Sequence, residues 1–194
     1  MVDQADPRPG LLAAFDQASR VIAGVSPAQM GQPTPCSEFD VRALNEHLVG
    51  VARRVVAVGR GEPQTGRVDV SGIAEQGFAK AFDEARLEAF ATWADDSILT
   101  RVVVLPFATL PGAAAAGIYT MELTAHAWDL ASGTGQLESL DPALAEAAFA
   151  VATQVLPPEP RGGEIPFAAV VEVPEGASPY DRLAGYLGRR LHLT

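Results

Sequence analysis

The feature that most constrains the fold is an apolar stretch, residues 119–131, that carries ionisable side chains in its middle. At about 100° per residue on a helix, Glu122 and Asp129 share one face and His126 lies at its edge. The opposite face, which includes Leu123, is also apolar, and a helix that is apolar nearly all round is normally buried. A buried carboxylate is costly unless it is paired or bound to a metal ion. The stretch therefore predicts a central, buried helix with a polar site on it.

The charge balance limits the classes of function. The chain has 24 acidic and 14 basic residues among 194, a net charge of −10, which disfavours binding to nucleic acid or to an anionic membrane surface. A single cysteine rules out an internal disulfide framework. The sequence shows neither a leader-like apolar segment at its start nor an apolar run of about 18 residues. We therefore expect one domain spanning residues 1–194, located in the cytoplasm, without nucleic-acid or membrane partners.

Further helices are predicted wherever apolar residues recur every three or four positions. They cover residues 10–24, 37–58, 73–93 and 141–156, and a short last helix starts after Ser178. The second is the clearest, with an apolar stripe of Val41, Leu44, Leu48, Val51, Val55 and Val58. Its expected N-cap is Ser37, in a capping box closed by Asp40. The stripe expected for the helix from residue 141 is Leu144, Ala148, Val151 and Val155.

Two other segments lack a helical pattern. Residues 98–105 are rich in β-branched side chains and are bounded by Pro106 and Pro111, so they support at most a small strand or hairpin. An apolar extended run at residues 167–173 is expected to lie back across the helices. The predicted fold class is all-α: one bundle of four or five core helices, with a short extended or hairpin segment and a C-terminal tail helix.

Three side chains are candidate metal ligands. Glu122 and His126 are four residues apart and so point the same way from successive helical turns. His47 lies beside the apolar stripe of the second helix, between Leu44 and Val51, and so faces the core or its edge. A site of these three donors would leave positions open for water or substrate. The third histidine, His192, is interpreted as unrelated.

Each candidate also has an alternative interpretation without a metal. His47 would then be a hydrogen-bonded core histidine, and Glu122 would form a buried ion pair with Arg53 or Arg101. Asp129 would hydrogen-bond a neighbouring loop. On this view the helices enclose a buried polar network and no metal ion.

Two motifs in the sequence resemble a known family. Residues 33–48, PTPCSEFDVRALNEHL, resemble the "PTPC…W.VR.L..H" signature of actinobacterial metal-binding proteins in the DinB-like superfamily. Residues 122–131, ELTAHAWDLA, with Thr134-Gly135-Gln136 after them, resemble that family's second signature, and residues 167–187 resemble its tail. The group is related to the metal-binding domain of mycothiol-dependent maleylpyruvate isomerase. Phe39 stands where tryptophan is common, which we interpret as a change in packing.

The resemblance implies a DinB-like four-helix bundle and a divalent metal ion, zinc first and nickel second, held by His47, Glu122 and His126. It further implies a low-molecular-weight thiol, mycothiol, as cosubstrate of a transferase or isomerase in which the metal activates a thiolate towards an electrophilic small molecule. The alternative function is a non-catalytic metal or small-ligand binding module. Bundles of this family often dimerise, so a homodimer is allowed.

Two more residues near these motifs receive roles. Asp129, one turn beyond His126, is expected to orient an imidazole or to bind the polar part of the thiol, with direct metal ligation as the alternative. Cys36 lies near the start of the second helix, where a thiol can be activated as a nucleophile. We favour its interpretation as a small buried packing residue.

Overall fold

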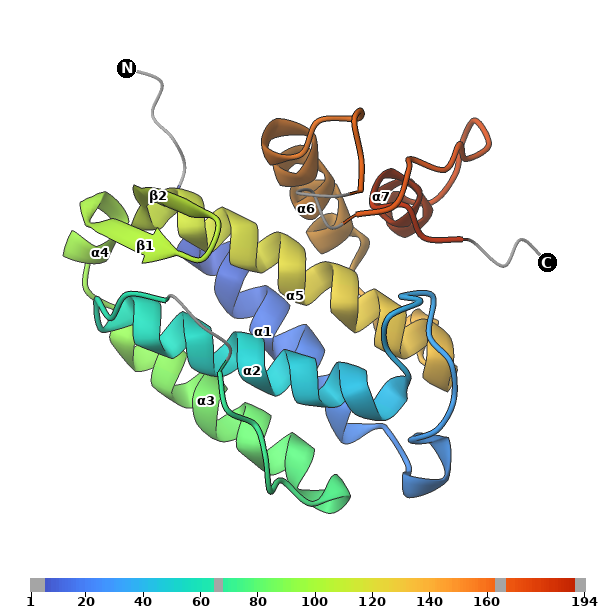
Figure 1. Ribbon diagram of the computed structural model, residues 1–194, viewed down its shortest axis with the longest axis horizontal. Helices are drawn as coiled ribbons and strands as arrows, with labels where there is room; N and C mark the ends of the chain where they lie inside the picture. Colours follow the sequence, from blue (N-terminus) through green and yellow to red (C-terminus); the bar gives the residue numbers. More distant parts are fainter. Residues whose placement is uncertain (1–5, 65–67, 163–166, 191–194) are drawn as a thin grey trace.

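The computed structural model describes residues 6–64, 68–162 and 167–190 (Figure 1). These residues are predominantly helical and include one small antiparallel hairpin, which confirms both of these features of the prediction. The α-helices are α1 Arg8–Ala23, α2 Val41–Gly59, α3 Phe78–Thr92, α4 Ser97–Thr100, α5 Gly112–Thr134, α6 Pro142–Val155 and α7 Pro179–Tyr186. The strands are β1 Val102–Leu105 and β2 Ala108–Pro111, and single 3-10 turns lie at Pro27–Gln29, Glu75–Gly77 and Leu137–Ser139. None of the described helices is both long and apolar enough to cross a membrane.

Four long helices surround the main core. α1 packs against α3 and α5, and α2 packs against the same two helices, so each helix of the group has two neighbours in it (Figure 1). Aromatic side chains fill the interior: the rings of Phe15 and Phe82 are 5.7 Å apart, and the indole N–H of Trp93 donates to the Val55 carbonyl at 2.9 Å. The predicted stripe of the second helix is buried, and so are Phe78, Phe82, Ala85, Ala89 and Trp93 of the third.

The central helix α5 is apolar all round because it lies between two cores. Leu123 and Leu130 point into the main core. Met121 and Trp128, on the opposite side, pack into a second apolar cluster with α6 and α7. The buried amide of Gln17 on α1 connects the two layers, since it donates to the Tyr180 hydroxyl at 2.8 Å and accepts from the backbone N–H of Asp141 at 2.7 Å. Burial on both faces explains why this stretch shows so little amphipathic pattern.

Two helix starts differ from the sequence prediction, and a third agrees with it. α2 begins at Val41, and its N-cap is Asp40, whose carboxylate accepts the Ala43 N–H at 2.8 Å. Ser37 is therefore not the N-cap, because Asp40 supplies the capping carboxylate three residues later. α3 begins at Phe78 rather than at residue 73, since residues 73–74 are not helical and Glu75–Gly77 form a 3-10 turn. In α6 the N-cap Asp141 is as predicted, accepting from Ala143 at 2.9 Å.

Two predictions about packing are also corrected. Val155 was expected in the buried stripe of α6, but its side chain is 45% exposed, because the face that packs on α5 is made of Ala145, Ala148 and Ala152. The segment 167–173 packs along α7 rather than across the bundle, and the Val171 N–H donates to the Gly185 carbonyl at 2.9 Å. Gly185 permits this approach, since a Cβ there would lie 2.7 Å from the Val171 oxygen.

Candidate metal centre

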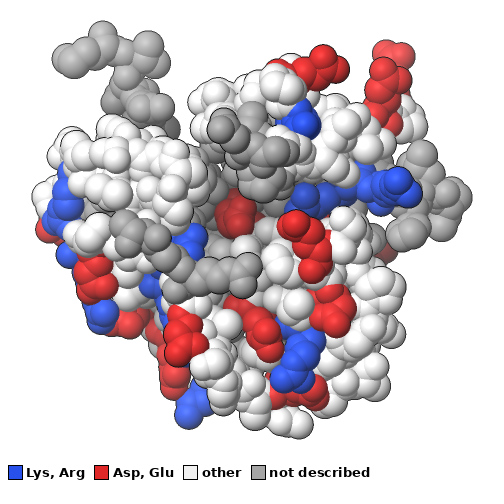
Figure 2. Space-filling model, viewed as in Figure 1, with Lys and Arg blue, Asp and Glu red and all other residues white. Residues whose placement is uncertain are grey.

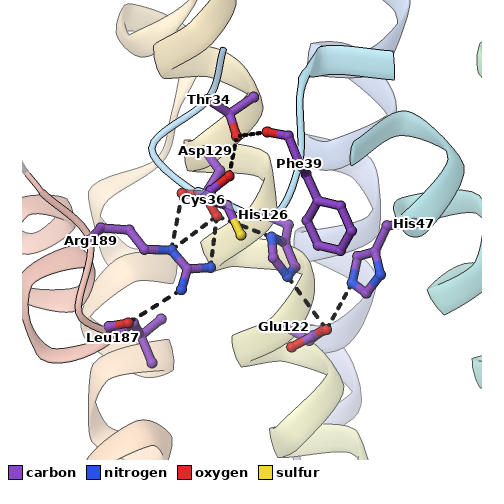
Figure 3. Close-up of polar contacts among 9 residues, drawn as sticks. All are labelled: Thr34, Cys36, Phe39, His47, Glu122, His126, Asp129, Leu187 and Arg189. Atoms are coloured by element: carbon purple, nitrogen blue, oxygen red, sulfur yellow. Dashed lines mark hydrogen bonds and ion pairs between the residues drawn. The ribbon is translucent and has the colours of Figure 1, made fainter. Parts of the chain in front are cut away.

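The sequence-predicted ligands His47, Glu122 and His126 meet between α2 and α5 (Figure 3). The Glu122 carboxylate oxygen Oε1 lies 3.1 Å from His47 Nε2 and 3.6 Å from His126 Nε2. The two imidazole rings are 4.6 Å apart at 73° to each other. One ligand atom from each of the three residues lies within 4.8 Å of the others. The three side chains therefore converge on one point, from two helices whose sequence positions are far apart.

The cluster is closed on one side and open on the other. His126 is 8% exposed, whereas His47 and Glu122 keep 29% and 27% of their side-chain surface. Figure 2 shows a hollow in the face of the molecule over α5, with acidic side chains in it and at its rim. The exposed fractions mean that water or a small molecule can reach the His47 and Glu122 side of the cluster.

The pKa values of Glu122 and His126 are both strongly shifted. Burial disfavours the ionised form of Glu122, but the imidazoles of His126 and His47 outweigh it and hold the pKa of this carboxyl well below its usual range. Burial likewise opposes protonation of His126, yet Glu122 and Asp129 raise the pKa of its imidazole to about 9. The cluster is therefore an anionic carboxylate placed between nitrogen donors, which is the environment that a divalent cation takes in proteins.

A second polar group adjoins the first and shares His126 with it. The Asp129 carboxylate lies 3.0 Å from His126 Nδ1 and accepts from Arg189, whose Nη2 donates at 2.9 Å and whose Nε lies 3.2 Å from the other oxygen. The Cys36 thiol is close enough that its sulfur, His126 and Asp129 form a second set of atoms within 4.8 Å. Burial opposes ionisation of Asp129, but His126 and Arg189 lower its pKa.

The loop before α2 shapes both groups. The Thr34 hydroxyl donates to the backbone carbonyls of Phe39, at 2.7 Å, and Cys36, at 3.1 Å, which curls the loop on itself. Phe39 then stacks on the His47 ring, with centroids 4.9 Å apart and planes 28° apart. Gly133 on α5 lets the loop approach, because a Cβ there would lie 2.9 Å from the Pro33 oxygen.

The structure distinguishes between the alternative roles of several of these residues. Arg53 and Arg101 donate to the carbonyls of Asp69 and Gly59, at 2.6 Å and 3.2 Å, so neither is the partner of Glu122. The Cys36 side chain is buried and burial raises the pKa of its thiol, as expected of a packing residue. His192 lies outside the described residues.

Sequence reasoning missed Arg189. The residue follows α7, and no motif or periodicity marks it. The sequence could have indicated only that such a partner exists. A fully buried Asp129 requires a cationic partner, and arginine is the residue best suited to a two-point contact with a carboxylate. The identity of that partner depends on the fold.

The fold and the site define a class: a predominantly helical protein with a cluster of two histidines and one carboxylate between two of its long helices. Residues 11–131 match the family described as the mycothiol maleylpyruvate isomerase N-terminal domain, a span that contains His47, Glu122 and His126. The chain therefore belongs to this family, which confirms the resemblance noted in its sequence.

Relatives extend the match to nearly the whole chain. The uncharacterized proteins MT0763 and Rv0738, from two strains of Mycobacterium tuberculosis, are each 35% identical to it over 188 residues. That span covers 95% of this chain and 98% of each relative. No solved structure gives a significant match. The names of these relatives assign no activity.

Proposed function

We propose that this protein binds a divalent metal ion and acts as a low-molecular-weight-thiol-dependent transferase or isomerase, with mycothiol as the thiol. The observation that carries the proposal is the convergence of His47, Glu122 and His126 beside a solvent-accessible side of the cluster. Family membership supports both the metal and the thiol. The second substrate would be a small molecule with an electrophilic carbon.

The donor set fits a divalent cation of intermediate softness. Imidazole nitrogen and carboxylate oxygen suit zinc and nickel, and three protein donors leave an exchangeable position. His47 Nε2, His126 Nε2 and a Glu122 oxygen would hold the ion, which when bound lowers the pKa of a thiol at the exchangeable position. Glu122 supplies the negative charge of the site, while Phe39 packs on His47 and limits its rotation.

In this proposal Asp129 orients the imidazole of His126 or binds the polar part of the thiol, and its contact with His126 Nδ1 supports the orienting role. A carboxylate on Nδ1 leaves Nε2 directed towards Glu122. Direct ligation by Asp129 is less well supported, because its oxygens already contact Arg189. Cys36 serves as packing.

The exposure of the cluster favours an enzyme over a non-catalytic binding module. A structural zinc ion is usually closed by four protein ligands, whereas here His47 and Glu122 are more than a quarter exposed. As further parts of the proposal, α1, α2, α3 and α5 form the DinB-like four-helix bundle, residues 1–194 form one domain, and the protein is cytoplasmic. A homodimer remains a prediction, to be checked by sedimentation.

The first experiment measures the metal content of the purified protein by mass spectrometry after loading with zinc or nickel. We expect about one ion per chain, and its loss in both His47→Ala and His126→Ala. His192→Ala, which changes the third histidine of the chain, is the matched control and should keep the ion. Circular dichroism of each variant checks that the helices are retained.

A thiol-transfer assay then separates the two functions. Metal-loaded protein should accelerate the addition of mycothiol to model electrophiles, and the two histidine variants should not. One ion per chain without acceleration would favour the binding module. If the folded wild-type protein takes up no ion, the metal-dependent function is wrong and the cluster is a buried polar network.

A further inference from the structure

A chain of contacts connects the C-terminal segment to the candidate metal centre. Arg189 lies three residues beyond the end of α7 and donates to Asp129 from Nη2 at 2.9 Å and from Nε at 3.2 Å to one oxygen and 3.3 Å to the other. Asp129 in turn contacts His126 Nδ1 at 3.0 Å (Figure 3). Asp129 is fully buried and the Arg189 side chain is 11% exposed. Such a pair has little freedom to rearrange.

The last residues of the described chain hold Arg189 in place. Gly188 has φ of 77°, in the left-handed region, and a Cβ there would lie 2.7 Å from the Ala168 oxygen. The Arg189 backbone N–H donates to the Ala184 carbonyl at 2.9 Å, and its Nη1 donates to the Leu187 carbonyl at 3.2 Å. The guanidinium is therefore aimed at Asp129 by the turn that ends α7 and by residues 168–173 packed against it.

This arrangement determines which nitrogen of His126 is available. His126 binds a metal ion as a neutral imidazole, with one N–H and one lone pair, and the carboxylate of Asp129 at Nδ1 favours the proton on that nitrogen. The lone pair offered to the ion is then on Nε2, the nitrogen that faces Glu122 at 3.6 Å. If Asp129 moved away from Nδ1, the tautomer and the ring orientation of His126 would no longer be fixed.

Arg189 also neutralises the negative charge of Asp129 in the second polar group. Cys36, His126 and Asp129 offer sulfur, nitrogen and oxygen atoms within 4.8 Å of one another, which is also the spacing of a metal site. The guanidinium already donates to both oxygens of Asp129 there. It supplies the positive charge that a second cation would otherwise bring.

We propose that Arg189 is a positioning residue for the metal centre. It fixes Asp129, which directs His126 Nε2 to the ion. The segment after α7 therefore contributes to metal binding. The proposal rests on metal binding by His47, Glu122 and His126. It adds a determinant outside the matched span 11–131.

The test compares metal affinity in Arg189→Met, Arg189→Lys and the control Arg190→Met. Arg190 is the neighbouring residue and is exposed. Dissociation constants for Zn²⁺ come from competition with a chromophoric chelator, and the visible absorption of Co²⁺-loaded protein reports the ligand geometry. We expect Arg189→Met to weaken binding by about 10–100-fold, the range for residues that orient a metal ligand, and to alter the Co²⁺ spectrum. Arg189→Lys should recover part of the affinity, and Arg190→Met should match wild type.

A double variant identifies the route of the effect. If Arg189 acts through Asp129, adding Arg189→Met to Asp129→Asn should cause little further loss of affinity. A folded Arg189→Met with wild-type affinity and an unchanged Co²⁺ spectrum would overturn the positioning role and leave the proposed function standing. Equal losses in Arg189→Met and Arg190→Met would also overturn it. Absence of binding in the wild-type protein would instead remove both proposals.

Discussion

The two polar groups that share His126 have similar spacing and different chemistry. In the first, the carboxylate of Glu122 contacts the imidazoles of His47 and His126, and the group is partly exposed. In the second, Asp129 is fully buried and already paired with a guanidinium. Each group brings three potential ligand atoms within 4.8 Å. Proximity of donors alone therefore does not distinguish them.

The two groups differ in the residues that contact their carboxylate. Among the described contacts of Glu122, both partners are imidazoles, whose lone pairs are available to a metal once they are deprotonated. The contacts of Asp129 include an arginine, which cannot be deprotonated in a protein and so keeps its place. The first group is therefore suited to bind a cation, whereas in the second the carboxylate is already paired with a guanidinium.

Replacing Glu122 should produce the largest change. A structural zinc site of four ligands contributes about 10–16 kcal/mol, so one ligand corresponds to about 2.5–4 kcal/mol, and Glu122→Gln should weaken Zn²⁺ binding by about a hundred- to a thousandfold. Chelator competition measures this loss. The matched control is Glu46→Gln, which removes a carboxylate near His47 in sequence that pairs with Arg42. Equal affinities in wild type and Glu122→Gln would show that Glu122 is not a ligand.

Replacing Asp129 should affect stability more than Glu122→Gln does. Asp129→Asn leaves the buried Arg189 without its counter-charge, and we expect the metal-free protein to lose about 2–3 kcal/mol of unfolding free energy in urea. Glu122→Gln should cost about 1 kcal/mol or less, because that group is partly exposed. Asp83→Asn, in a surface pair with Arg86, is the control. Similar stability losses for the two site variants would contradict the distinction between the groups.

Much of the fold was predictable because helical periodicity and burial coincide here. The buried stripe of α2 was predictable from the spacing of its apolar residues. The hairpin was predictable from its β-branched residues and the prolines that bound them. The start of α2 was misplaced because Ser37 and Asp40 are both good N-caps, and only the folded loop shows that Asp40 takes the role. Val155 was predicted to be buried because it is large and apolar, whereas the face of α6 that packs on α5 consists of alanines.

The residues of the site also differ in how well the sequence predicts their positions. His47, Glu122 and His126 were predictable because each lies on a long helix, where spacing fixes direction. Arg189 was not, since it reaches Asp129 from a turn after α7 whose course depends on Gly188 and on residues 168–173. Loop residues have no periodicity from which a direction can be inferred. Arg189, the residue proposed to position the site, is therefore harder to predict from the sequence than the three candidate ligands.

Removing the ring that packs on His47 should have an intermediate effect. Phe39 stacks on this imidazole at 4.9 Å, and an aromatic pair contributes about 0.5–1.5 kcal/mol. Phe39→Ala should therefore weaken metal binding by about twofold to tenfold, and Phe39→Trp should stay close to wild type. Phe107→Ala, on the hairpin and 66% exposed, is the control. A loss in Phe39→Trp as large as in Phe39→Ala would show that shape, rather than stacking, matters here.

Replacing Cys36 should change metal binding least, although its sulfur lies among potential ligand atoms. Its thiol is buried, burial raises its pKa, and the neighbouring Asp129 is already neutralised by Arg189, so no cation is needed to stabilise the group. Cys36→Ser should keep one Zn²⁺ per chain with a dissociation constant within about twofold of wild type. The native thiol should also react slowly with a disulfide reagent and rapidly in urea. A lost ion, or a sulfur-to-metal charge-transfer band in Co²⁺-loaded wild type that Cys36→Ser abolishes, would place the metal in the second group instead.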